Sequence, residues 1–330
     1  MYMHNRYIIT GAAGFIGSYI CRELLEKSDT ESVIGIDNLN PYYSSKIKQF
    51  RLAEFETNPK FKFYNESITA TQRLINILDA YKPTTLIHAA AEVGVRNGEE
   101  NPLQYFSTNV IGTLSVLEAC RRHISHAVVF SSSSVYGNTS TVPFNEAEDI
   151  HLYTPISVYG ASKTSMEIGV KNFFDRTGIP TTIVRPFSVY GPNGRPDMLP
   201  LKLLMSAKQQ NRIDIYSPSV LSRDWTYIED FLQMFLALLD RPNKLQIVNL
   251  GSGRPLLLKD VIHVAEDVIH QHGLTLKCSY KSASPAEMLQ TWANNDKIQN
   301  ISKIKKFRDF NYGFTKTADF FFSHLDLYSV

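Results

Sequence analysis

A glycine-rich segment near the start of the chain constrains its fold more than any other feature. Residues 7–10 form a short β-rich run that leads directly into Gly11, Gly14 and Gly17, and residues 18–27 then show the apolar spacing of a helix. A strand, a glycine-rich turn and a helix in this order form a cradle for a pyrophosphate, because glycines let the backbone approach it and the helix start offers unpaired N–H groups. A tight turn in which the glycines serve only packing is the weaker alternative.

An acidic residue follows the second expected strand. Residues 32–36 end in Asp37, about 20 residues beyond the glycine segment, where a carboxylate accepts hydrogen bonds from ribose hydroxyls and repels a 2′-phosphate. Asn38, not a basic residue, comes next. This position predicts NAD rather than NADP as cofactor, with the capping of a turn as the alternative role of Asp37.

Strand-like and helical segments alternate along the first part of the chain, which predicts an α/β fold. We expect a Rossmann-like, doubly wound parallel sheet of about seven strands, followed by a smaller C-terminal α/β lobe. Beyond the segments already named, the expected strands are 61–64, 85–89, 127–131, 181–185 and 246–249, and helices are expected at 70–80, 102–121 and 162–177. The expected domains are 1–185 with 225–250 for NAD, and 186–224 with 251–330 for the second ligand.

Composition bounds the partners and the compartment. The net charge is +2, so neither nucleic acid nor an anionic membrane surface is expected as a partner. Three cysteines in 330 residues favour a reducing compartment, and no apolar run approaches the ~20 residues of a membrane-spanning helix. We therefore predict a soluble, cytoplasmic protein. The histidines have no acids or cysteines at ligand spacing, so no metal site is predicted.

Tyr159 and Lys163 are four residues apart, which places them on one face of a helix. A phenol normally ionises near pH ~10, but an adjacent ammonium favours the phenolate, which can act as a general base near neutral pH. Considered alone, such a pair is more often an ordinary surface feature. The glycine segment and Asp37 give it a functional context.

These features together resemble the extended short-chain dehydrogenase/reductases, and the resemblance covers nearly the whole chain. The motifs that carry it are the glycine loop, Asp37, residues 88–91, Asn109, the serine run 131–137 and Tyr159 with Lys163. Five runs, of which 131–137 is already named, sharpen it towards the nucleotide-sugar epimerases that act on UDP-glucuronate: 37–43, 94–96, 131–137, 189–198 and 223–228.

The resemblance implies NAD-dependent epimerisation at C4 of a UDP-uronic acid through a transient 4-keto sugar. Tyr159 would act as the base, Lys163 would hold the nicotinamide ribose and the phenolate, and Ser132 would hydrogen-bond the same sugar oxygen. A homodimer formed through a four-helix bundle is also implied. The implied cofactor-binding residues are Gly11, Gly14, Phe15, Ile16, Gly17, Asp37, Asn38, Ala89, Ala90, Ala91, Asn109, Tyr159 and Lys163.

The serine run and the loop near residue 195 bear on the substrate. Sugar 4,6-dehydratases of the family carry Asp-Glu where this chain has Ser133 and Ser134, so dehydration is not expected. The resemblance implies that the sugar carboxylate is bound by Arg195, in a charge-assisted contact, together with small hydroxyl residues. The implied substrate-binding residues are Ser132, Ser133, Ser134, Ser188, Arg195, Arg223 and Glu287.

Three positions depart from the family pattern: Ser67, Glu92 and the Ala-Glu pair at 286–287. They keep open a 4-epimerase of a neutral or N-acetylated UDP-hexose or its uronate. Net oxidoreductase action and a catalytically silent NAD-binding protein are further alternatives, and the intact Ser132, Tyr159 and Lys163 argue against the silent protein. His88 and Arg185 are expected to be structural rather than catalytic.

Overall fold

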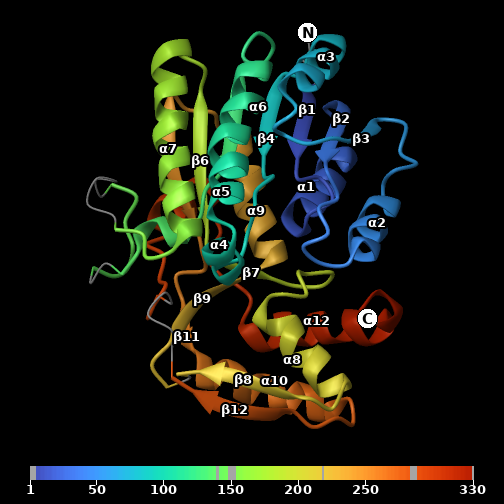
Figure 1. Cartoon of the computed structure of the whole chain (residues 1–330), viewed down its shortest axis with the longest axis vertical. Coiled ribbons are helices and arrows are strands. Elements are labelled where there is room, and N and C mark those ends of the chain that lie inside the picture. The colour runs from blue at the N-terminus through green and yellow to red at the C-terminus, as the bar shows by residue number, and fades with distance from the viewer. Residues whose placement is uncertain (1–4, 139–140, 148–153, 218, 283–287, 329–330) are drawn as a thin grey trace. The chain divides into compact units, whose positions relative to one another are not determined.

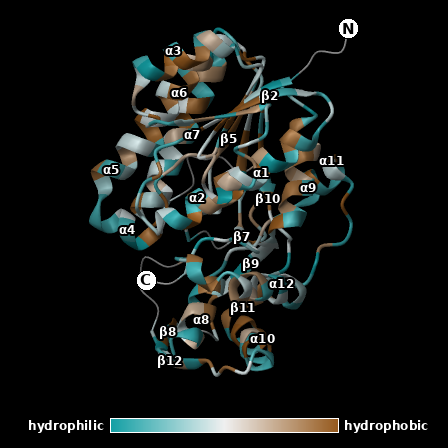
Figure 2. Cartoon of the chain, turned by 90° about the vertical axis from the view of Figure 1, so that its right-hand side faces the viewer, coloured by the Kyte–Doolittle hydropathy of each residue, from teal (hydrophilic) through white to brown (hydrophobic). Residues whose placement is uncertain are grey.

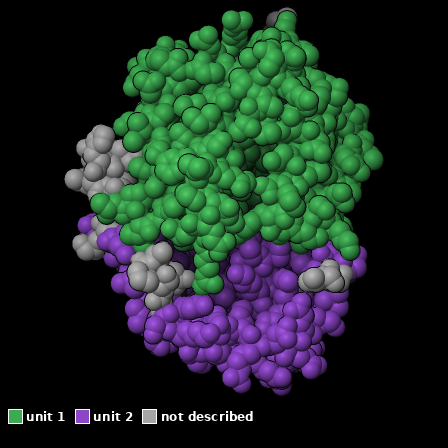
Figure 3. Space-filling view, viewed as in Figure 1, with its two compact units in different colours: residues 1–135, 153–185, 239–248 green, residues 136–152, 186–238, 249–330 purple. Residues whose placement is uncertain are grey.

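The computed structural model of the chain describes residues 5–138, 141–147, 154–217, 219–282 and 288–328. Two compact units share the chain, and Figure 3 shows which residues belong to each. Unit 1 comprises residues 1–135, 153–185 and 239–248, and unit 2 comprises residues 136–152, 186–238 and 249–330. The assignment of one ligand to each lobe stays a prediction.

A seven-stranded sheet forms the centre of unit 1 (Figure 1). Its strand order is β10-β6-β5-β4-β1-β2-β3, and the ladders from β6 through to β3 are all parallel. The Rossmann-like α/β fold predicted from the sequence is confirmed. The strands are β1 (Asn5–Thr10), β2 (Thr30–Asp37), β3 (Phe61–Asn65), β4 (Thr85–His88), β5 (His126–Phe130), β6 (Thr181–Pro186) and β10 (Leu245–Leu250).

The strand order reverses between β1 and β4. The chain runs outward from β1 to β3, returns to β4 on the other side of β1, and continues to β6. Because parallel crossovers are right-handed, this reversal places the connecting helices on opposite faces, as Figure 2 shows for α3, α6 and α7 against α1. Ligands of such sheets bind beyond the carboxyl ends of the strands at the reversal. The helices are α1 (Phe15–Glu26), α2 (Ser45–Ala53), α3 (Thr71–Tyr81), α4 (Val95–Glu100), α5 (Pro102–Phe106), α6 (Thr113–Cys120) and α7 (Val158–Thr177).

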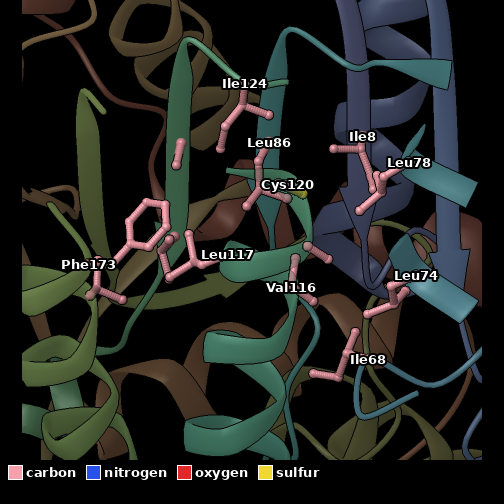
Figure 4. Close-up of a cluster of buried hydrophobic side chains, with 14 of the residues drawn as sticks. Ile8, Ile68, Leu74, Leu78, Leu86, Val116, Leu117, Cys120, Ile124 and Phe173 are labelled. Atoms are coloured by element: carbon pink, nitrogen blue, oxygen red, sulfur yellow. The ribbon is translucent and has the colours of Figure 1, made fainter. Parts of the chain in front are cut away.

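A buried apolar cluster of unit 1 lies between the sheet and α3, α6 and α7 (Figure 4). Leu74 and Leu78 of α3, Val116 and Leu117 of α6 and Phe173 of α7 are all buried there against strand residues. Apolar residues three or four positions apart on each helix make one continuous buried stripe. This packing fixes α7 against β5 and β6, and so fixes the helix that carries Tyr159 and Lys163.

Unit 2 contains two small sheets and several well-formed helices. One sheet has the order β11-β9-β7, and β8 pairs with β12 in parallel. The rings of Tyr190 on β7, of Trp225 and Tyr227 on β9 and of Phe310 pack together. The elements are β7 (Ser188–Tyr190), α8 (Leu199–Lys208), β8 (Arg212–Tyr216), β9 (Ser222–Tyr227), α9 (Ile228–Leu239), β11 (Pro255–Leu257), α10 (Leu258–Gln271), β12 (Lys277–Lys281), α11 (Asp296–Ser302) and α12 (Phe310–Ser323).

In the described parts of the chain, no helix is both long enough and apolar enough to traverse a bilayer.

Candidate active site

The glycine turn links β1 to α1 by a close backbone approach. Gly11 has φ of 74°, and a Cβ there would lie 2.8 Å from the nitrogen of Ala90 and 2.9 Å from the carbonyl carbon of Ala89. At Gly17 a Cβ would overlap the carbonyl oxygen of Gly11. Only glycine fits these two positions. The turn therefore lies directly against residues 89–90, which follow β4 at the strand reversal.

The first turn of α1 offers its backbone N–H groups to a ligand. Gly14 is the N-cap, no side chain caps the helix, and no acidic residue stands in the first turn. Phe15 is buried and Ile16 is half-buried in that turn. Uncapped N–H groups and the positive end of the helix dipole suit an anion. This geometry fits the predicted pyrophosphate.

Asp37 ends β2 and is buried beside the glycine turn. Its carboxylate accepts hydrogen bonds from the backbone nitrogens of Ala13 (3.1 Å) and Leu39 (2.8 Å). Lys48 from α2 brings its Nζ to 3.8 Å from the same carboxylate, and both side chains are nearly buried. No local sequence pattern predicts Lys48, because it lies eleven residues away and reaches Asp37 only through the packing of α2. Asn38 follows Asp37 directly, and its side chain accepts from the nitrogen of Asn40 at 3.1 Å.

Asn109 joins the segment after β4 to the helix of Tyr159. It is fully buried in a π-helical turn, Ser107–Gly112, between α5 and α6. Its side-chain oxygen accepts from the nitrogen of Glu92 (2.8 Å), and its side-chain nitrogen donates to the carbonyl of Glu92 (3.1 Å) and to Ser162 Oγ (2.9 Å). Single π-turns inside α-helices often mark functional sites. The expected continuous helix over 102–121 is thus interrupted at Asn109.

The segment at 89–91 is tied to β1. The nitrogen of Ala89 donates to the carbonyl of Thr10 (3.1 Å), and that of Ala90 donates to Thr10 Oγ1 (3.3 Å). Ala91 is half-buried. His88 is a core residue, with Nδ1 2.7 Å from Thr10 Oγ1 and Nε2 2.9 Å from Thr113 Oγ1. Burial, then the charge of Lys163, lowers the pKa of His88 to about 3, so it is neutral at physiological pH.

Tyr159 and Lys163 lie in the first two turns of α7. The helix begins at Val158, four residues earlier than expected, and Ser157 caps it by accepting from the nitrogen of Gly160 at 3.1 Å. Lys163 is 2% exposed, and its Nζ donates to the carbonyl of Phe130 at 2.7 Å. Burial lowers the pKa of Lys163 to about 8, while the charge of Glu167 opposes this shift. Its ammonium is therefore fixed at the carboxyl end of β5.

The serine run follows β5 directly. Ser132 is buried, and its Oγ accepts from the nitrogen of Ser134 at 3.1 Å, while Ser133 opens a 3₁₀ turn. A Cβ at Gly160 would lie 2.7 Å from the carbonyl oxygen of Ser134. The start of α7 thus packs against this run. Lys163 contacts the carbonyl of Phe130, which lies two residues before Ser132. The end of β5 and the start of α7 therefore hold the three predicted catalytic residues in one region of unit 1.

Two departures from the family pattern have local partners. Glu92 is buried, and its Oε1 accepts from the amides of Asn40 (2.7 Å) and Gln104 (2.9 Å). Ser67 shares a hydrogen bond with Thr69 Oγ1 (2.8 Å) on the surface. The Glu92 carboxylate therefore links the loop after Asp37 to α5.

The other predicted substrate residues lie in unit 2. Ser188 opens β7 and is the register partner of Trp225 on β9. Arg195, in the loop before α8, forms a two-point ion pair with Asp197. Arg223 on β9 donates to the carbonyls of Ser222 (2.8 Å) and Leu289 (3.4 Å). Glu287 lies outside the described residues.

Asp224 is a buried carboxylate that the sequence reasoning did not single out. Its oxygens accept from the nitrogens of Ser252 (2.9 Å), Gly253 (2.9 Å) and Ala293 (3.0 Å), and from Ser252 Oγ (2.6 Å). Burial raises the pKa of Asp224, and these hydrogen bonds oppose the shift. It joins β9 to two loops and fixes the strand on which Arg223 lies.

Within the described residues, no group of three or more His, Cys, Asp or Glu side chains is placed to hold a metal ion. The absence of a metal from the chemistry stays a prediction.

The parallel sheet with its glycine turn, and the buried lysine four residues after Tyr159, define the class of dinucleotide-binding α/β proteins. The chain belongs to the NAD dependent epimerase/dehydratase family, whose sequence model matches residues 7–251. The family predicted from the sequence motifs is confirmed.

Several relatives are similar over nearly their whole length. The UDP-glucuronate 4-epimerase of Thermodesulfobacterium geofontis is 36% identical over 302 residues, which cover 91% of this chain and 89% of that protein. A probable UDP-glucuronate 4-epimerase of Rhizobium meliloti is 30% identical over 320 residues, covering 91% and 92%. A crystal structure of UDP-glucuronic acid 4-epimerase from Bacillus cereus, in complex with UDP-glucuronic acid and NAD, is 29% identical with a TM-score of 0.87, covering 96% of this chain and 99% of that one.

Proposed function

We propose that this protein is an NAD-dependent isomerase that inverts C4 of a UDP-uronic acid, interconverting UDP-glucuronate and UDP-galacturonate. The observation that carries the proposal is the Lys163 ammonium, which lies on the same helix as Tyr159 and is held by the carbonyl of Phe130, two residues before Ser132. Proton removal from a sugar alcohol requires a general base, a cation that favours the ionised form of that base and a hydroxyl that donates a hydrogen bond. The named activities of the relatives in this family support the same reaction.

Each side chain has a defined part in the proposed reaction. When bound, NAD supplies reversible hydride transfer at C4. Tyr159, as phenolate, takes the proton of the 4-hydroxyl and returns it after the 4-keto sugar has turned over. Ser132 donates a hydrogen bond to the same oxygen, and Lys163 stabilises the phenolate. Ser133 and Ser134 supply hydroxyls rather than a carboxyl acid and base, which disfavours elimination of water.

Recognition of the cofactor rests on the residues of the β1–α1 turn and their neighbours. The glycines and the N–H groups at Phe15 and Ile16 would hold the pyrophosphate, and Asp37 with Asn38 would hold the adenosine ribose. Ala89 and Ala90 border the glycine turn, and Asn109 fixes the following segment to α7. These contacts use this chain's own backbone and buried side chains.

We assign binding of the substrate carboxylate to Arg195 and Ser188 of unit 2, in line with the family resemblance. A 4-keto uronate is a β-keto acid that loses CO₂ when its carboxylate bond stands perpendicular to the ketone plane. A charge-assisted, two-point clamp would prevent that alignment. Arg223 would contact the diphosphate, and Glu287 the uridine ribose.

An exposed apolar patch on unit 1 supports a homodimer as the working form. It comprises Leu103 of α5, Phe106, Ile111 of the π-helical turn and Ile168 of α7, which are 85%, 38%, 58% and 51% exposed. Large apolar side chains grouped on adjoining helices are unusual on a free surface. A second copy of the chain would cover them through a four-helix contact.

We also assign the protein to the cytoplasm and to the supply of acidic sugars for polysaccharide synthesis. Cys21, Cys120 and Cys278 are free thiols, and the first two are buried, which suits a reducing compartment.

The proposal is tested by incubating the purified protein with UDP-glucuronate, with UDP-glucose and with UDP-N-acetylglucosamine, and following the sugar ring by NMR. We expect C4 inversion of the uronate without net accumulation of NADH. Inversion of a neutral sugar alone would reassign the substrate, and no inversion of any of the three would overturn the proposal.

A further inference from the structure

A fully buried ion pair includes Glu167, which lies one helical turn after the proposed catalytic lysine. Arg185 of β6 donates from Nε to Glu167 Oε1 at 2.9 Å and from Nη2 to Oε2 at 2.7 Å, and both side chains are 0% exposed. Burying two charges is costly because both lose their hydration, and an apolar pair of similar volume is often as stable or more so. The pair therefore calls for a reason other than stability.

Its position on α7 supplies that reason. Glu167 lies four residues after Lys163 and eight after Tyr159, so the three side chains follow one face of the helix. β5 pairs with β6 so that Phe130, which accepts from Lys163, is the register partner of Val184, the neighbour of Arg185. The acid, its arginine and the lysine thus meet where α7 crosses β5 and β6.

No other described acid takes this place. The groups that interact with Lys163 are the Phe130 carbonyl on β5, Met166 and Glu167 on α7, and His88 on β4, while Arg185 on β6 contacts Glu167. His88 is neutral at physiological pH, and Arg185 has the same sign as Lys163. Glu167 is therefore the source of negative charge that opposes the cost of burying the ammonium.

We propose that Glu167, oriented by Arg185, is a positioning residue that keeps the buried Lys163 cationic and aligned with Tyr159. This inference rests on the proposed function of Tyr159 and Lys163. Arg185 then acts on the site indirectly: it orients Glu167, and Glu167 acts on Lys163. It does not contact the substrate.

The test uses a double variant, Glu167→Met/Arg185→Met, because Glu167→Gln alone would remove the negative charge that compensates a buried guanidinium. The matched control is Glu118→Met/Arg176→Met, which removes an exposed ion pair between α6 and the end of α7.

The measurement is the pH profile of kcat and KM for UDP-glucuronate from pH 6 to 10 in both folded variants. We expect the alkaline limb of kcat to move down by about one pH unit, with about a tenfold loss at pH 9 and KM within about twofold. An unchanged alkaline limb in a folded double variant would overturn the proposal.

A second readout does not depend on activity. Lys163 binds its proton more weakly in the folded chain than in the unfolded one. The unfolded chain therefore holds more protons above about pH 8, so the contribution of Lys163 to the free energy of unfolding rises with pH from about 8 upward. In the double variant this rise should begin about one pH unit lower, and in the control it should stay in place. If the rise in stability begins at lower pH in the double variant, but neither the wild type nor the control inverts C4, the proposed function fails and the role of Glu167 stands. If the rise begins at the same pH in the double variant and in the control, Glu167 does not have this role.

Discussion

Arg195 and Asp197 form a two-point salt bridge two residues apart in the loop before α8, with Nε–Oδ1 at 3.0 Å and Nη2–Oδ2 at 2.5 Å. About a fifth of each side chain is exposed. The guanidinium proposed to bind a sugar carboxylate is thus already oriented by a carboxylate of the chain. Because the two residues are near neighbours, the pair forms at little cost in chain entropy and holds the guanidinium plane in place.

Replacing Arg195 by Ala is expected to weaken binding of UDP-glucuronate by about 10- to 100-fold, since a charge-assisted hydrogen bond contributes about 1.5–3 kcal/mol. Binding of UDP-glucose should change by less than about twofold. Titration calorimetry with both nucleotides measures this difference. The same variant should also release more UDP-pentose, the sugar nucleotide left when the 4-keto uronate loses CO₂, because the carboxylate is no longer clamped. Arg212→Ala, at an exposed arginine of β8, is the control, and equal losses for both sugars in Arg195→Ala would contradict the assignment.

Replacing Tyr159 by Phe removes the proposed base and leaves the helix intact. We expect the rate of C4 inversion to fall by at least about 10²- to 10⁴-fold, the usual contribution of general acid–base catalysis, while NAD stays bound through the glycine turn, Asp37 and Lys163. NMR of the sugar ring and release of the nucleotide from denatured protein give the two quantities. Tyr280→Phe, at a residue 61% exposed, is the matched control. Activity within tenfold of the wild type would contradict the role of Tyr159.

How far the sequence predicted this site depends on how local each feature is. The glycine turn, Asp37 and the Tyr159–Lys163 pair are local patterns, and the structure places all of them at strand ends or helix starts as the patterns indicate. The earlier start of α7 at Val158 follows from the cap at Ser157, which a short Ser-containing segment does not single out.

The unpredicted features depend on tertiary packing. Lys48 reaches Asp37 only because α2 folds back, and Glu167 meets Arg185 only because α7 packs on β6. The π-helical turn at Asn109 shifts the hydrogen bonds of a helix without changing its apolar spacing, so periodicity gives no sign of it. The strands β7 and β11 have three residues each, too few for alternation to be recognised.

Stability should fall as pH decreases below about 6.5 because of His88. Burial and the Lys163 charge hold its pKa at about 3, whereas the unfolded chain takes up a proton near pH ~6.5. The unfolded state therefore binds more protons between these values, and the free energy of unfolding drops by about 1.4 kcal/mol per pH unit. His126, whose pKa burial lowers to about 4, adds to the slope.

The measurement is the melting midpoint between pH 7 and 5, above the range in which most carboxylates titrate. His88→Gln keeps groups able to bond Thr10 and Thr113 but does not titrate, so its midpoint should depend less on pH than that of the wild type. An identical pH slope in both proteins would show that His88 is not the group responsible.

Asp224→Asn should destabilise unit 2. Every described partner of this carboxylate donates a hydrogen bond, so an amide nitrogen in place of one oxygen would face donors and leave two of them unsatisfied. Each buried unsatisfied group costs about 1–3 kcal/mol, which predicts a melting midpoint lower by at least about 4 °C. Asp214→Asn, at an exposed pair with Lys281, is the control and should shift the midpoint by less than about 2 °C. Equal midpoints for the two variants would contradict the structural role of Asp224.

Leu103 gives the sharpest test of the proposed dimer, because it is the most exposed of the large apolar residues on the described surface, at 85%. Leu103→Glu places a charge within the proposed helix contact, where burial without a partner is costly. We expect the wild type to elute as a dimer at micromolar concentration in gel filtration with light scattering, and the variant as a monomer. Val220→Glu, at an exposed apolar residue of unit 2, should leave the dimer intact. A monomeric wild type would show that no surface joins two copies at this concentration. A variant that still forms dimers would show that another surface joins them.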